Sequence, residues 1–242
     1  EVKYKVLGVI TARGGSKSIP RKNIKELCGK PLIFYTIEAA KKSGIFDRLI
    51  LSTDDEEIAE VGRNYGVETP FMRPKELAGD TTPHLPVIQH AVRWLAENEN
   101  YQPDFVSILQ PTAPLRQAFH LQEALALLIK SGADSVVGVN EVPGHTHPLW
   151  TFKLDPENRM TLSTGEPVKN KIKRRQDLPF KAYYASGAIY IFKPRVLFDA
   201  EPSFYGDEVA GYVMEEKYGV NIDEPGDWEL AEKAIRKINE RV

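Results

Sequence analysis

The sequence predicts an α/β fold in three layers, with a mainly parallel sheet flanked by helices. Short apolar runs of strand length alternate with segments of helical period up to Val142, and this alternation is typical of layered α/β proteins. The chain has 242 residues, of which 42% are hydrophobic and 27% charged, so a disordered or fibrous protein is excluded. We therefore expect one α/β domain over residues 1–242.

The first elements are marked by clear start and stop signals. The run KVLGVIT over 5–11 is almost wholly apolar and predicts a buried strand. A polar loop over 12–30 leads to a helix that begins at Pro31, whose fixed φ suits a first turn, and ends at Gly44. The apolar run RLILST over 48–53 predicts the second strand.

The later elements follow the same rhythm, because short apolar runs predict strands and apolar residues three and four positions apart predict one buried helix face. Strands are expected over 105–109, 135–142 and 187–192, and helices over 56–66, 87–98, 118–131 and 225–241. Loops at the carboxyl ends of the strands are the expected ligand-binding edge of such a sheet.

Residues 143–182 interrupt this alternation. The segment contains prolines, turns, short polar strands and the basic stretch KNKIKRRQ. We interpret it as an arm inserted into the single domain. A solvated basic arm is the simpler alternative, and a nuclear localisation signal is a weaker third reading.

Charge and cysteine content exclude several classes of partner. The 32 basic and 34 acidic residues give a formal charge of −2, and the pI is near 6.3, whereas nucleic-acid binding normally needs a basic excess. No apolar run approaches the roughly 20 residues that span a bilayer, and we expect neither a nucleic acid nor a membrane as partner. The single cysteine, Cys28, cannot form an internal disulfide, so we expect a cytoplasmic protein.

The loop after the first strand has the composition of a triphosphate-binding loop. Two adjacent glycines let a ligand approach the backbone, and four cations lie within ten residues at Arg13, Lys17, Arg21 and Lys22. Its spacing fits neither GxxxxGK[ST] nor GxGxxG, which argues against a P-loop NTPase and a dinucleotide oxidoreductase. A solvated basic loop with turn glycines is the alternative that the loop alone leaves open.

The stretch ARGGSKSIPRKNI resembles the signature loop of the N-acylneuraminate cytidylyltransferases, also called CMP-sialic acid or CMP-nonulosonate synthetases. Further similar stretches follow in the family's order: LSTDDEEIAEVGRNYGVE, RPKELAGD, LQPTAPLR, RRQDLP, GAIYIF and VNIDEPGDW. The resemblance implies a Rossmann-like nucleotide-diphospho-sugar transferase fold. It also implies transfer of CMP from CTP to the anomeric hydroxyl of a nonulosonic acid with release of pyrophosphate, and a homodimer formed through the arm.

The resemblance assigns the nucleotide and the catalytic cations to the first loop. Arg13, Lys17 and Lys22 would hold the triphosphate as catalytic residues, with Lys22 nearest the reacting phosphorus. Arg21 stands where the family varies, so we expect it to face solvent. The nucleotide-binding residues implied are Ala12, Arg13, Gly14, Gly15, Ser16, Lys17, Lys22, Asn23 and Arg73.

The acceptor and the metal are assigned to later segments. The resemblance implies that the sugar acid is bound by Gln110, Thr112, Arg116, Arg175 and Ser186. A guanidinium suits the carboxylate of the sugar acid. Mg²⁺ would be bound by Asp223 and, in place of the family's second aspartate, by Asn221. Residues 221 and 223 would share one face of a strand, and we expect Asp227 to cap the last helix.

Ser186 replaces an asparagine of many relatives, which makes legionaminic or pseudaminic acid as plausible an acceptor as N-acetylneuraminate. A GTP-using relative, or an enzyme for the eight-carbon Kdo acid, remains an alternative. A non-catalytic nucleotide-sugar binding module is favoured by Asn221 but opposed by the retained cations and Asp223. The five histidines show no zinc-site spacing, and His84 is expected to begin a helix.

Overall fold

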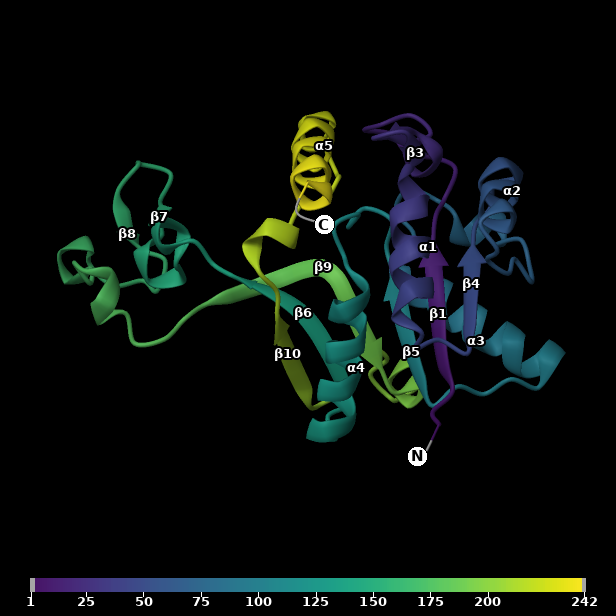
Figure 1. Ribbon diagram of the computed structural model, residues 1–242. Coiled ribbons are helices and arrows are strands. Elements are labelled where there is room, and N and C mark those ends of the chain that lie inside the picture. Colours follow the sequence, from purple (N-terminus) through teal and green to yellow (C-terminus); the bar gives the residue numbers. More distant parts are fainter. Residues whose placement is uncertain (1–2, 241–242) are drawn as a thin grey trace.

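The computed structural model describes residues 3–240 and shows a six-stranded sheet between helices (Figure 1). The strand order is β10-β6-β9-β5-β1-β4. Among these six strands, β9 runs antiparallel to both its neighbours and the other pairings are parallel. The mainly parallel α/β fold expected from the sequence is confirmed. The strands are β1 (Val6–Thr11), β4 (Arg48–Ser52), β5 (Phe105–Leu109), β6 (Ser135–Glu141), β9 (Tyr183–Phe192) and β10 (Val209–Val213).

Helices cover both faces of the sheet, which explains why the central strands β1 and β5 are buried along almost their whole length. Along β1, Val6 and Ile10 pack into the core beneath α1, α2 and α4, whereas Leu7 and Val9 pack into the core beneath α3. The fifth helix packs against the loop that follows β1, through Ile19 and Leu27, and against Ile222 in the segment that precedes the helix. The helices are α1 (Leu32–Ser43), α2 (Glu56–Asn64), α3 (His84–Glu99), α4 (Ala118–Ser131) and α5 (Pro225–Asn239).

Beyond shifts of one or two residues at element ends, the sheet, its helices and the segment before α5 differ from expectation at four places, and one of them is β10 (Val209–Val213), a strand that was not expected. The third helix starts at His84 rather than at 87, the strand expected at 187 starts at Tyr183, and residues 219–223 form an extended loop instead of a strand. The expected end of the last helix at 241 lies outside the described residues.

The polar loop over 12–30 contains local structure of its own. A 3-10 turn, η1 (Lys22–Ile24), is followed by a two-stranded hairpin, β2 (Glu26–Leu27) and β3 (Lys30–Pro31). The hairpin turn at Cys28 and Gly29 has a positive φ at both residues. Within residues 3–240, no helix combines the length and the apolar character that crossing a membrane requires.

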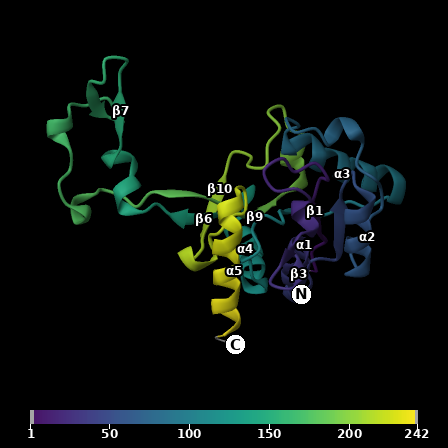
Figure 2. The same cartoon turned by 90° about the horizontal axis from the view of Figure 1, so that it is seen from above.

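The segment between β6 and β9 projects away from the sheet as an arm (Figures 1 and 2). It contains a short antiparallel pair, β7 (Phe152–Leu154) and β8 (Met160–Leu162). The remaining elements, inside and outside the arm, are the 3-10 turns η2 (Lys75–Leu77), η3 (Gly144–Thr146), η4 (Pro148–Trp150), η5 (Val168–Asn170), η6 (Arg175–Asp177), η7 (Pro194–Leu197) and η8 (Glu216–Tyr218).

Candidate active site

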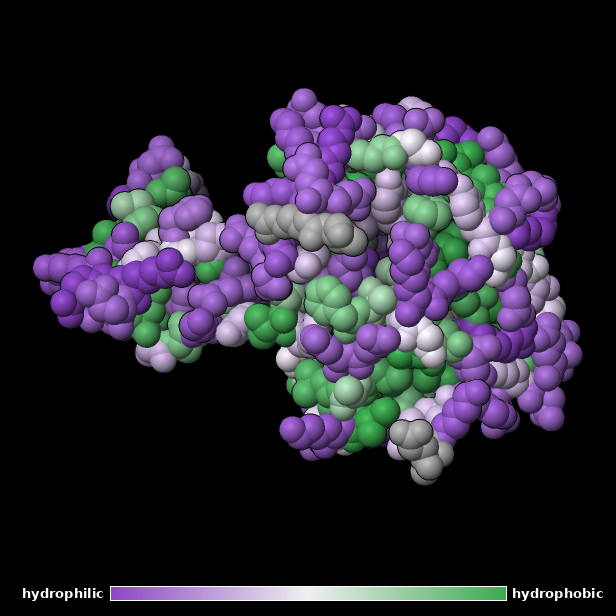
Figure 3. All heavy atoms as spheres, in the orientation of Figure 1, coloured by the Kyte–Doolittle hydropathy of each residue, from purple (hydrophilic) through white to green (hydrophobic). Residues whose placement is uncertain are grey.

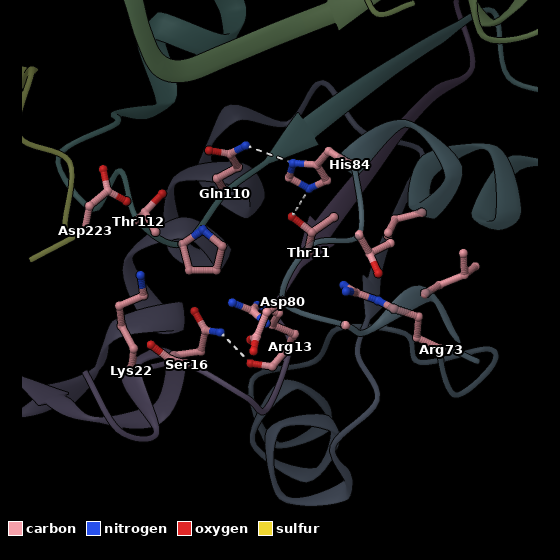
Figure 4. A pocket seen from close by; sticks show the side chains of 16 residues that line it. Thr11, Arg13, Ser16, Lys22, Arg73, Asp80, His84, Gln110, Thr112 and Asp223 are labelled. Atoms are coloured by element: carbon pink, nitrogen blue, oxygen red, sulfur yellow. Dashed lines mark hydrogen bonds and ion pairs between the residues drawn. The ribbon is translucent and has the colours of Figure 1, made fainter. Parts of the chain in front are cut away.

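A cavity of about 290 Å³ opens at the carboxyl ends of β1 and β5, beside the start of α3 (Figure 4). This is the edge at which ligands bind in open α/β sheets. One wall is the basic loop after β1, and the opposite wall is the loop after β5. The lining residues are Thr11, Arg13, Ser16, Lys22, Asn23, Arg73, Leu77, Gly79, Asp80, Thr82, His84, Val87, Gln110, Pro111, Thr112 and Asp223.

The basic loop is held in place by hydrogen bonds to the segment after β4 and within the loop itself. The backbone N–H of Gly14 donates to the Asp54 carboxylate at 3.0 Å, and the Asn23 amide donates to the carbonyl of Arg13 at 3.1 Å. A Cβ on Gly14 would lie 2.6 Å from Oδ2 of Asp55, whereas a Cβ on Gly15 would meet nothing within 4 Å. The first glycine is therefore needed for packing, and the second leaves room for a ligand. Ala12 is buried.

The cation expected nearest the reacting phosphorus lies at the base of the cavity. Lys22 is half-buried, and its Nζ donates to the carbonyl of Ile222 at 3.1 Å. Burial lowers the pKa of Lys22, and the nearby Asp223 carboxylate opposes this shift. The side chains of Lys22 and Asp223, which are 201 positions apart in the sequence, thus line one cavity (Figure 4).

The other two cations are paired with an acid that the sequence analysis did not select. Asp80, in the segment after η2, forms an ion pair with Arg13 and a second with Lys17, whose Nζ lies 2.6 Å from its Oδ2. Hydrogen bonds from Lys17 and Arg13 lower the pKa of Asp80. Lys17 remains 80% exposed. Phosphate oxygens would have to take the place of this carboxylate.

Arg21 is not a free surface cation. It pairs with Asp55 and with Glu57, and Asp55 in turn caps α2 by accepting from the N–H of Ile58. Arg21 therefore joins the loop to the start of α2. This agrees with the absence of Arg21 from the cavity lining among the described residues.

Arg73 is fixed in the wall of the cavity. Its Nε donates to the Ser52 hydroxyl at 3.1 Å and its Nη2 to the Ser52 carbonyl at 2.7 Å. Burial lowers its pKa to about 10, so the side chain stays charged at neutral pH. The bonds to β4 leave the guanidinium rigid, as a binding cation should be.

The loop after β5 supplies the opposite wall. Gln110, Pro111 and Thr112 line the cavity, and the backbone carbonyl of Thr112 accepts from the N–H of Ile222 at 2.8 Å. This bond ties the loop to the segment that carries Asp223. The Nε2 of Gln110 lies 3.2 Å from Nδ1 of His84.

Two residues expected to bind substrate are instead buried. Arg116 is 1% exposed and donates to the Ala188 carbonyl at 2.6 Å, to the Gln110 carbonyl at 2.8 Å and to the Thr36 hydroxyl at 3.0 Å. Ser186 is 2% exposed. Neither side chain lines the cavity, so their assignment as substrate-binding residues is wrong for this structure. Through these hydrogen bonds Arg116 connects the loop that carries Gln110 to α1 and β9.

Asn221 does not face the cavity either. Its amide donates to the carbonyl of Ser186 at 2.6 Å, and its oxygen and nitrogen would lie 3.0 and 3.1 Å from a Cβ on Gly187. Gly187 has φ +74°, so both the backbone and the packed amide require glycine there. Because 219–223 is not a strand, the argument that 221 and 223 share a face fails.

Arg175 lies in η6 of the arm and does not line the cavity of its own chain. Its side chain is 69% exposed and lies 3.8 Å from a Glu141 oxygen. Asp227 accepts from the backbone N–H groups of Asp223 and Glu224 at 2.9 and 2.8 Å. This confirms that Asp227 caps α5, as the partner of Glu224 in a capping box.

Sequence reasoning missed eight lining residues, and three of these, Thr11, Asp80 and His84, bond to other residues of the cavity wall. Thr11 ends β1, and His84 begins α3 as expected but also bonds Thr11 and Gln110. A signal was available for Thr11, because side chains at carboxyl ends of strands face such sites. For the other two, only the folded chain shows what lies opposite.

The architecture is shared with a solved nucleotidyltransferase. The chain superimposes with a TM-score of 0.68 on CMP:2-keto-3-deoxy-manno-octonic acid synthetase complexed with CTP, covering 97% of this chain and 99% of that one. At 15% identity this likeness shows the fold alone. The mainly parallel sheet flanked by helices is thus a fold that this chain shares with that synthetase.

Sequence comparison gives the family within that class. A family model described as cytidylyltransferase matches residues 7–233. The pseudaminic acid cytidylyltransferase of Campylobacter jejuni is 37% identical, over 97% of both chains, and the CMP-N,N'-diacetyllegionaminic acid synthase of Legionella pneumophila is 34% identical, over 96% of both. The chain belongs to the cytidylyltransferase family and is a nucleotidyltransferase, as the resemblance of its motifs predicted.

Proposed function

We propose that this enzyme transfers CMP from CTP to the anomeric hydroxyl of a nonulosonic acid. A bond forms between the anomeric oxygen of the sugar and the α-phosphorus of CTP. The bond between the α-phosphorus and the oxygen that bridges to the β-phosphate breaks, so that pyrophosphate leaves, and the proton of the sugar hydroxyl is released. The observation that carries the proposal is one cavity with a triphosphate-type cation loop on one wall and an amide and hydroxyl wall opposite. A CTP-dependent reaction and the single cysteine favour the cytoplasm.

The cations of the loop would bind and neutralise the triphosphate. Lys22, held by the Ile222 carbonyl, presents a half-buried ammonium where charge on the α-phosphate must be stabilised. Arg13 and Lys17 would exchange the Asp80 carboxylate for β- and γ-phosphate oxygens. Fixed cations help pyrophosphate depart because they need no rearrangement during the reaction.

We further propose that Mg²⁺ is bound through Asp223, and that Asn221, the other residue expected to bind the metal, does not take part. Among residues 3–240, no group of three or more His, Cys, Asp or Glu side chains is arranged to hold a metal ion. The chemistry still fits, because Mg²⁺ is commonly held by one carboxylate together with substrate phosphates and waters. Bound there, the ion would supply further neutralisation of phosphate charge. Asn221 is engaged with Ser186 and Gly187 and is omitted.

The arm supports a homodimer. A two-stranded pair is marginally stable alone, yet β7 and β8 project from the body with apolar side chains at the surface (Figure 3). Leu154 is 64% exposed and Phe180 is 52% exposed. A second copy of the chain would cover them and bring Arg175 to the partner's acceptor.

Mixed dimers test this arrangement. Lys22→Ala and Arg175→Ala chains are each expected to be poorly active alone. If Arg175 serves the partner's site, mixing and re-forming dimers restores about a quarter of wild-type activity, because half of the dimers then contain one intact site. No recovery, in a mixture shown by mass spectrometry to contain mixed dimers, would contradict the proposal.

The reaction itself is tested by pyrophosphate release with CTP and Mg²⁺ across neuraminic, legionaminic, pseudaminic and Kdo acids, with GTP replacing CTP in parallel. We expect turnover with CTP and at least one nonulosonic acid. Lys22→Ala and Asp223→Ala should each lower kcat by about 10²- to 10³-fold, the size seen when one charge-stabilising donor is removed. CTP binding without turnover on any acid would favour a binding module instead.

A further inference from the structure

Three side chains form a hydrogen-bonded row along one wall of the cavity (Figure 4). The ring of His84 lies between the other two. Its Nε2 is 2.8 Å from Oγ1 of Thr11, and its Nδ1 is 3.2 Å from Nε2 of Gln110. These residues come from the end of β1, the start of α3 and the loop after β5.

The placement of the Gln110 amide determines which tautomer of the His84 ring fits the row. The amide is placed with its NH₂ group toward Nδ1, and an NH₂ group can only donate, so the tautomer that fits has the lone pair on Nδ1. The ring proton therefore lies on Nε2 and is donated to the Thr11 hydroxyl. Burial, with the charge of nearby Arg73, lowers the pKa of His84 to about 4, which keeps the ring neutral at neutral pH. A doubly protonated ring would present an N–H to the NH₂ group.

This row fixes which end of the Gln110 amide meets a ligand. A primary amide presents a donor or an acceptor according to its rotation. Here the NH₂ is directed to His84, and the amide oxygen points away from the ring, on the side of Thr112 and Asp223 (Figure 4). The wall therefore presents a hydrogen-bond acceptor, and a ligand group that faces it must be a hydrogen-bond donor.

We infer that His84 is a positioning residue that directs the oxygen of the Gln110 amide toward the bound sugar acid. The enzyme thereby selects a sugar acid that places a hydroxyl or an acylamino N–H opposite this oxygen. The inference rests on the proposed function in taking the acceptor to be the ligand at this wall. An analogue of the sugar acid that lacks this hydrogen-bond donor should be rejected, because the amide oxygen of Gln110 would then be left without a hydrogen bond.

The first test is kinetic. His84→Ala should lower kcat/KM for the sugar acid by about tenfold, which corresponds to the loss of one positioned hydrogen bond, while KM for CTP changes less than about twofold. In a Gln110→Ala background the same substitution should have no further effect, because its target is gone. His84→Gln, which can accept from the amide, should recover part of the loss. His90→Gln, on α3 outside the cavity lining, is the matched control and should match wild type.

The second test needs no turnover. The ¹⁵N shifts of the His84 ring distinguish a proton on Nε2 from one on Nδ1, with the His84→Gln variant assigning the signal. A proton on Nδ1 would mean that Gln110 presents its NH₂ to the ligand, and would overturn the inference whatever the activity. Additive effects of the two alanine variants would also overturn it. Failure of every acceptor would instead count against the proposed function, while the ring tautomer would still decide the inference.

Discussion

Two histidines, His120 in the core and the half-buried His84, should make the fold lose stability as the pH falls from 7 to 5. Burial lowers the pKa of His84 and of His120 from 6.5 to about 4. Between these values the unfolded chain binds protons that the folded chain does not, so the free energy of unfolding falls as the pH falls. Each histidine accounts for about 2 kcal/mol between pH 7 and pH 5, or about 4 kcal/mol together.

The pH window separates these rings from the acidic residues. The pKa values of Asp55, Asp134 and Asp227 are lowered from an ordinary value of 3.8, so their contributions are lost only at lower pH. Urea unfolding followed by circular dichroism at pH 7, 6 and 5 measures the loss, with the slope m as a check that the transition is unchanged.

Variants assign the effect to each ring. Asparagine can replace Nδ1 as an acceptor, so His120→Asn retains the bond from the N–H of Gln117, which is 2.9 Å in the wild type. Each single His→Asn variant should lose about half of the pH dependence, and the double variant most of it. The assignment of neutral rings would be refuted if the wild type lost less than about 1 kcal/mol of unfolding free energy between pH 7 and pH 5. It would also be refuted if the double variant showed the same pH dependence of stability as the wild type.

Other predictions follow from single contacts. Asp80→Asn should lower KM for CTP, most clearly at low salt, because its two cations are released for phosphate; a higher KM would make Asp80 part of the nucleotide site. Arg116→Met should lower the free energy of unfolding by about 3 kcal/mol, measured in urea, because three acceptors each lose a hydrogen bond, although the Gln110 carbonyl keeps a backbone donor, the N–H of Ala113; unchanged stability with weakened binding of the sugar acid would restore its role as a substrate ligand. Gly14→Ala should destabilise by about 1–3 kcal/mol through its clash with Asp55, whereas Gly15→Ala should stay within about 0.5 kcal/mol by the same measurement; equal effects would contradict the packing argument.

Much of the fold was predictable because local periodicity reports burial. The helix over Ala118–Ser131 and the strand over Phe105–Leu109 have the boundaries expected, since apolar spacing and turn residues lie within the elements themselves. The start of α3 was placed three residues late, because His84 and Pro86 do not resemble a buried helix face. The segment before α5 was taken for a strand, but no neighbouring strand pairs with it in the described sheet.

The candidate site was predictable only in part. Residues of the first loop were found together because one motif carries them. Arg13, Ser16, Lys22 and Asn23 line the cavity with Gln110, Thr112 and Asp223, whereas Ala12, Gly14, Gly15 and Lys17 do not. Arg116 and Ser186 occupy motif positions as well, yet both face inward. A motif gives the residue type and spacing, and burial depends on what packs against it.

The sequence by itself determined the α/β alternation, the position of the phosphate-type loop and the family, since each depends on residues close together in the chain. The tertiary structure decided which polar groups meet. Asp80 reaches Arg13 across 67 positions and His84 reaches Thr11 across 73. Such contacts exist only once the sheet and helices have packed, because hydrogen bonds and ion pairs act over a few ångströms in space, whatever the separation along the chain.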